Sequence, residues 1–244
     1  MHTLYCGPSW GEQSFESVNG DDPIKTNLAK ELGLTNYTSL ALGANSSFDQ
    51  LQRAKTFMRL HNELAPFRIL FVTANSIQDG HKFENVSQID FAKSFLSSSD
   101  PLAMVQDYEA RFYHEIVKLE IPVALIGAHV DTHCQSHDNI TVIHPSWQNF
   151  LGKLCNLRPV YGWCADVGHR WLHGHVIPEQ GPPLQFVLES KPSSAVVDEI
   201  HNLFEFWHLL EIAGLFKGCH PNIKANQLFA SHIQSSISHW LDQH

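Results

Sequence analysis

The stretch Leu4-Tyr5-Cys6-Gly7-Pro8-Ser9-Trp10-Gly11 runs from a short apolar segment directly into a tight turn that presents a serine. Residues 2–6 are typical of a strand, and glycine and proline then allow a sharp change of direction. A turn at the end of a strand places the Ser9 hydroxyl at the carboxyl edge of a sheet, where open α/β folds bind their ligands. The pattern therefore favours Ser9 as a nucleophile, against the alternative of an ordinary turn with a solvated serine.

Apolar strands alternate with amphipathic helices through most of the 244 residues. Further strands are expected at 37–42, 68–73, 121–127 and 139–143, and helices at 24–32, 46–64, 100–119, 196–215 and 223–240. Such alternation implies βαβ crossovers and a parallel sheet. We therefore predict a single α/β domain over residues 1–244. An irregular insertion at about 145–195, rich in Gly, Pro, Trp and His, interrupts it, and Trp10 and Trp147 are expected in the core.

The composition excludes several classes of function. The formal net charge is -9 and no cluster of Lys and Arg is present, which argues against a nucleic-acid or anionic-membrane partner. No apolar run approaches the roughly 20 residues of a membrane span, and no basic region precedes an apolar run as in a signal peptide. The five cysteines form no CxxC pair, which suits reduced thiols. A cytoplasmic location is therefore expected.

Candidate chemical groups follow three of the predicted strands. Ser9 follows the first strand, Gly43 the second and Asn75 the third, and a His220-Pro221-Asn222 turn opens the last helix. A serine hydroxyl is a weak nucleophile that needs a base within hydrogen-bond reach, and a tetrahedral intermediate needs donors aimed at its oxyanion. The backbone amides of Ser9 and Gly43 and the side-chain amide of Asn75 would supply three donors. This set of groups is what acyl transfer requires.

The order Ser…Gly…Asn…His resembles the SGNH (GDSL-type) hydrolase family. Gly7-Pro8-Ser9 matches its Gly-Asp-Ser block, Gly43 its lone glycine, residues 73–76 (Thr-Ala-Asn-Ser) its Gly-x-Asn-Asp block, and residues 217–222 its Asp-x-x-His block. The resemblance covers nearly the whole chain except the insertion.

The resemblance implies a three-layer, flavodoxin-like α/β fold with a five-stranded parallel sheet in the order 2-1-3-4-5. It also implies hydrolysis of a small-molecule ester, an acetyl or acyl group on a carbohydrate or lipid, without a cofactor. Ser9 would attack, His220 would carry the proton, and Ser9, Gly43 and Asn75 would bind the oxyanion.

Lys217 departs from the family pattern, because it stands where the family has the aspartate that orients the histidine. A lysine cannot accept a hydrogen bond, and its charge disfavours a protonated imidazole. Three interpretations stay open: a Ser–His dyad, a catalytically silent binding protein, or a triad in which another acceptor serves. That acceptor would be a backbone carbonyl or a carboxylate such as Asp166, Asp198 or Glu211.

A second Asp-x-x-His pattern lies at Asp166-Val167-Gly168-His169. If His169 were the base, Asp166 would complete a triad. The sequence after His169 is broken by proline rather than helical, so the pattern favours His220 as the base.

Two clusters of potential metal ligands are also present. Imidazole and thiol groups are ligands for zinc and similar ions. Neither cluster has the spacing of a standard zinc module, so solvated loop side chains and no metal are expected. The clusters are His129, His133, Cys134 and His137, and His169, His173 and His175.

Overall fold

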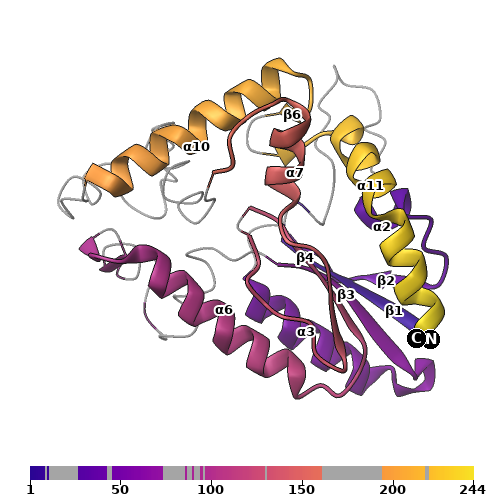
Figure 1. Cartoon of the computed structure of the whole chain (residues 1–244). Helices are drawn as coiled ribbons and strands as arrows, with labels where there is room; N and C mark the ends of the chain where they lie inside the picture. Colours follow the sequence, from indigo (N-terminus) through magenta and orange to yellow (C-terminus); the bar gives the residue numbers. More distant parts are fainter. Residues whose placement is uncertain are drawn as a thin grey trace, which may run out of the picture.

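Five parallel strands form one sheet in the order β2-β1-β3-β4-β5 in the computed structural model (Figure 1). They are β1 (His2–Cys6), β2 (Tyr37–Ser39), β3 (Phe67–Thr73), β4 (Val123–Gly127) and β5 (Ile140–His144). The predicted sheet, its parallel pairing and its strand order are thereby confirmed. The structure describes residues 1–8, 10, 27–42, 46–73, 86, 90, 94–95, 97–129, 131–160, 194–217 and 220–244.

Helices of the described residues begin at side chains that cap them. Ser46, Asp100, Ser146 and Asn222 each accept a hydrogen bond from the backbone amide three residues later, which satisfies one of the free donors of a helix start. The elements are α2 (Leu28–Glu31), α3 (Ser47–Leu60), a 3-10 turn (Asn62–Leu64), α6 (Pro101–Val117), α7 (Trp147–Leu154), α10 (Ser194–Ile212), the hairpin β6 (Phe216–Lys217) and β7 (His220–Pro221), and α11 (Ile223–Gln243).

The sheet is covered on both faces, which gives three layers. Successive strand residues point to opposite faces, so both faces of β3 bury apolar side chains. Ile69 and Phe71 pack with α3 and α6, whereas Leu70 and Val72 belong to the core that contains α2, α7 and α11. Figure 1 shows α3 and α6 on one side of the sheet and α2 and α11 on the other. This confirms the three-layer fold.

Several predicted elements are shorter than expected, as three examples show. The helix predicted at 24–32 is observed over Leu28–Glu31, because Asn27 caps it by accepting from the amide of Lys30. The strand predicted at 37–42 ends at Ser39, although Leu40 and Leu42 still donate hydrogen bonds to strand β1 and the residue after it. The helix predicted at 46–64 ends at Leu60 and continues as the 3-10 turn.

Helix α7 lies inside the segment that the sequence suggested was irregular. Trp147 and Leu151, four positions apart, are fully buried, so this helix packs into the core of the α/β domain. Trp10 is also buried, which confirms the core placement expected for both tryptophans. Residues 161–193 of that segment lie outside the described residues.

Arg68 joins the start of the sheet to the end of the last helix. Its Nε donates to the Thr3 hydroxyl at 2.9 Å, and a terminal nitrogen donates to the Leu241 carbonyl at 2.8 Å. The guanidinium also lies 5.6 Å from the centre of the Trp240 ring. The two chain ends consequently lie side by side in Figure 1.

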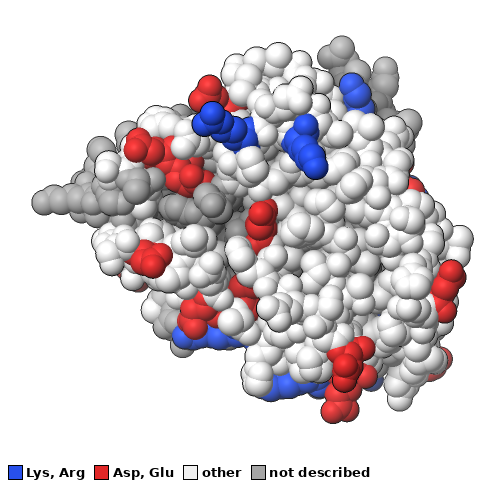
Figure 2. Space-filling model, in the orientation of Figure 1, with Lys and Arg blue, Asp and Glu red and all other residues white. Residues whose placement is uncertain are grey.

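The surface is sparsely charged on the face seen in Figure 2, where Lys and Arg side chains are scattered among uncharged atoms. In the part of the chain that the structure describes, no helix is both long enough and apolar enough to cross a membrane.

Candidate active site

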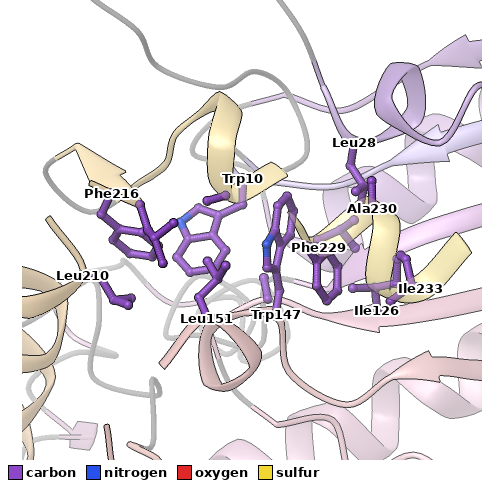
Figure 3. Close-up of a cluster of buried hydrophobic side chains, with 14 of the residues drawn as sticks. Trp10, Leu28, Ile126, Trp147, Leu151, Leu210, Phe216, Phe229, Ala230 and Ile233 are labelled. Atoms are coloured by element: carbon purple, nitrogen blue, oxygen red, sulfur yellow. The ribbon is translucent and has the colours of Figure 1, made fainter. Parts of the chain in front are cut away.

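The turn that carries Ser9 is held on both sides by buried residues. Ser9 itself lies outside the described residues, but Pro8 before it is buried and Trp10 after it is 1% exposed. The Trp10 indole meets the rings of Trp147 and Phe216 edge to face, with centroid distances of 5.8 and 5.3 Å. Figure 3 shows Trp10 between these two residues. The residues on both sides of Ser9 are therefore packed into the core.

The segment that carries Gly43 leaves the sheet beside the Ser9 turn. Residues 43–45 are not described, but the amide of Leu42 donates a hydrogen bond of 3.0 Å to the carbonyl of Gly7. The Leu42 carbonyl in turn accepts from the Gln50 side chain at 3.2 Å. Leu42, the residue before Gly43, is thus hydrogen-bonded to Gly7, which lies two positions before the candidate nucleophile Ser9.

Asn75 also lies outside the described residues, and Thr73 marks where its segment leaves the sheet. Strand β3 pairs in parallel with β1, with Phe71 opposite Cys6, and with β4, with Thr73 opposite Gly127. Parallel strands end at the same edge of a sheet. The segments of Ser9, Gly43 and Asn75 therefore depart from three adjacent strands at one edge, as the predicted order requires.

The candidate base His220 lies on a hairpin that packs against the Ser9 turn. Phe216 pairs with Pro221 and Lys217 pairs with His220 across the two short antiparallel strands. The ring of Phe216 is the one that meets Trp10, so this contact brings the hairpin to the carboxyl edge of β1. Asn222 then starts α11, and its side chain also donates to the Gly214 carbonyl at 2.9 Å.

Lys217 pairs with His220 across the hairpin, so the side chain at position 217 affects the surroundings of the histidine. Residues directly opposite in an antiparallel pair project to the same face with their Cβ atoms about 5 Å apart. A carboxylate at position 217 would therefore lie beside the imidazole. The chain has an exposed lysine there instead.

The alternative carboxylates are distributed unevenly over the molecule. Asp198 and Glu211 are both exposed on α10 and are separated by about 20 Å along the helix. Glu211 lies in the last turn, next to the Gly214 turn that leads into the hairpin, so it is the better placed of the two. Asp166 and His169 lie outside the described residues, and their role stays a prediction.

Two residues near the site were not assigned to it from the sequence. His129 follows β4, and its ring centre lies 4.2 Å from that of Trp10, next to the Ser9 turn. Cys6 ends β1, and burial raises the pKa of its thiol to about 12, which keeps it protonated and unsuited as a rival nucleophile. His129 is far from Trp10 in the sequence, and no pattern in a single sequence predicts that their rings are in contact.

His133 and Cys134 of the first cluster contact a buried carboxylate of α6. His133 and Thr132 both donate to the carboxylate of Glu109, which is 6% exposed on α6, and the His133 amide does so at 2.9 Å. Cys134 lies in the same contact, and burial together with this carboxylate raises its pKa to about 12. Glu109 thereby fastens the connection 128–139 between β4 and β5 to α6.

Across the described ranges, no group of three or more His, Cys, Asp or Glu side chains is arranged to hold a metal ion. His169, His173 and His175 lie outside those ranges.

Comparisons with known proteins give one structural similarity. No family model matches the chain, and no curated protein does. Among solved structures, the crystal structure of the lipase/acylhydrolase from Enterococcus faecalis is similar, with 14% sequence identity. The alignment covers 97% of this chain and 95% of that chain, with a TM-score of 0.36.

Proposed function

We propose that this chain is a serine hydrolase that cleaves a small-molecule ester, with Ser9 as nucleophile and His220 as base. The observation that carries the proposal is the contact between Trp10 and Phe216, at 5.3 Å between ring centres. Trp10 directly follows Ser9. Phe216 pairs with Pro221, which directly follows His220. The two groups that acyl transfer needs are thus on segments that pack together.

The proposed reaction has two halves. The Ser9 oxygen forms a bond to the ester carbonyl carbon while its proton passes to His220, and the oxyanion accepts hydrogen bonds from the amides of Ser9 and Gly43 and the side chain of Asn75. The carbon–oxygen bond to the alcohol then breaks, and the alcohol takes the proton from His220. Water hydrolyses the acyl-serine by the same route and releases a carboxylic acid.

A binding protein without catalytic activity is the second candidate. The position of Lys217 opposite His220 favours it, because a cation on the same face disfavours the imidazolium that forms during attack. A backbone carbonyl or Glu211 would have to orient the ring in an active enzyme. The two candidates make opposite predictions for chemical labelling of Ser9.

A fluorophosphonate probe distinguishes them. We expect the wild-type chain to be labelled, and Ser9→Ala and His220→Gln to lose labelling. The matched controls are Ser235→Ala and His239→Gln, which alter exposed positions on α11 and should leave labelling unchanged. If folded wild-type chain takes up no probe, the hydrolase proposal is wrong and the binding protein is favoured. If His220→Gln still labels, the same test on His169→Gln and His129→Gln identifies the base.

A further inference from the structure

A pocket of about 620 Å³ opens between the end of β5, helix α7 and helix α11. These two helices contact each other and lie side by side in Figure 1. The pocket is separated from the Ser9 turn by stacked rings: Trp147 packs on Phe229 at 4.7 Å, and Phe229 contacts His144 on the pocket side at 5.3 Å. Figure 3 shows Trp10, Trp147 and Phe229 in a row. The pocket is therefore distinct from the candidate active site.

Two imidazoles and one ammonium group line this pocket, those of His144, His232 and Lys153. The Nδ1 atom of His144 accepts the Ser146 amide at 3.1 Å, so the neutral ring carries its proton on Nε2 and offers a donor. The His232 ring lies 5.3 Å from the His144 ring, and Lys153 is exposed at the rim. The donors of the pocket come from three different elements of the fold.

Asp131 is the carboxylate in the lining, and it already accepts a hydrogen bond of 2.7 Å from the side chain of Asn149. The groups facing His144 are His232 and Phe229 from α11, Phe150 from α7, and Asp131 from the connection 128–139. Burial, together with the neighbouring His232, lowers the pKa of His144 to about 4, so its ring is neutral at pH 7.

The remaining walls of the pocket are apolar. Leu154 is 50% exposed there, although large aliphatic side chains on a surface favour burial by about 25 cal/mol per Å². A ligand with an apolar body would cover it. The apolar lining consists of Pro145, Phe150, Leu154, Leu157 and Pro159.

We propose that this pocket binds a carboxylate with an apolar chain or ring, its oxygens accepting from His144, His232 and Lys153. The body of the ligand lies against Leu154, Leu157 and Phe150. The site does not depend on the hydrolase proposal, because its test measures binding rather than catalysis.

Calorimetric titration of the full chain with octanoate tests the site, and octanamide is the matched ligand without the charge. We expect octanoate to bind at about 1 mM or below and octanamide at least about tenfold more weakly. Lys153→Gln should weaken octanoate binding by a similar factor, whereas Asp131→Asn should strengthen it by removing a like charge. Lys118→Gln, an exposed lysine on the far end of α6, is the matched control.

Each alternative outcome contradicts the proposal. Equal binding of octanamide would show that the carboxylate is not recognised, and weaker binding by Asp131→Asn would indicate a ligand that donates to this aspartate. No heat from folded wild-type chain at either ligand would mean that the pocket is not a site of this kind. Ser9→Ala should bind as the wild type does, and loss of binding there would place the ligand in the candidate active site instead.

Discussion

The Trp10 indole and the Phe216 ring meet edge to face at 5.3 Å, although 206 positions separate the two residues in the chain. This contact joins the first strand to the last hairpin. It holds Trp10, the residue after Ser9, against the hairpin that carries His220. The predictions below concern that hairpin and the packing of the fold.

Lys217→Asp should raise ester hydrolysis. The pairing of positions 217 and 220 places the new carboxylate beside the imidazole, where it fixes the ring and stabilises the imidazolium. We expect kcat/KM for 4-nitrophenyl acetate to increase by at least about tenfold. Lys118→Asp makes the same change of net charge at a distant exposed site and should have no effect. A Lys217→Asp variant no faster than this control would argue against His220 as the base.

Glu109→Gln should destabilise the fold. The carboxylate is 6% exposed: one oxygen accepts from Thr132 and the His133 amide, and the other lies 3.3 Å from Nδ1 of the His133 ring, where the nitrogen of an amide could not accept. We expect a loss of about 1–3 kcal/mol in the free energy of unfolding, measured by urea denaturation. Glu115→Gln on the same helix removes a third-exposed carboxylate paired with Lys55 and Lys118, and it should cost less than about 1 kcal/mol. Equal losses in the two variants would refute the role given to Glu109.

Protonation of His144 should weaken the fold in acid. Its pKa is lowered to about 4 in the folded chain, from an ordinary value of 6.5, chiefly by burial. Between those values the unfolded chain binds the proton and the folded chain does not, so stability falls as the pH drops through this window. His144→Asn keeps an acceptor for the Ser146 amide and cannot be protonated. Its unfolding free energy, followed by urea denaturation at several pH values, should depend less on pH than that of the wild type; an identical dependence would contradict the assignment.

Gly152→Ala should destabilise the chain even though alanine favours helices. A Cβ atom at position 152 would overlap the ring of Phe206, which packs from α10 onto α7. We expect a loss of about 1–3 kcal/mol in thermal or urea unfolding. Adding Phe206→Leu should recover part of that loss, because the smaller side chain makes room for the methyl group. Independent, additive effects of the two changes would show that the contact is not tight.

The sheet and most of its helices could be predicted from local patterns. The apolar run ending at Thr73 and the cap at Asp100 are signals contained in a few neighbouring residues, and both elements begin or end where expected. That Ser9, Gly43 and Asn75 follow three adjacent strands was implied by the family resemblance, which supplied the strand order. The parallel sheet confirms that the flanking residues depart at one edge.

The remaining features depend on contacts between distant segments. Helix α7 lies in a stretch rich in glycine and proline, and only the burial of Trp147 against Phe229 makes its place in the core evident. The role of Glu109 arises from a loop more than twenty positions away. The position of His129 beside Trp10 is set by the end of β4, which no short stretch of sequence encodes.

The hydrogen bonds of Arg68 bear on the order in which the chain folds during synthesis. It bonds to Thr3 near the first residue and to Leu241 near the last, across 173 positions in the second case. A chain emerging from the ribosome can pair β1, β2 and β3 early, but it cannot dock α11 until Ile223–Gln243 have been synthesised. The hairpin of His220 leads directly into that helix. A nascent or truncated chain that lacks this hairpin and helix therefore carries Ser9 without its proposed base, and the proposed activity requires that both have been synthesised and docked.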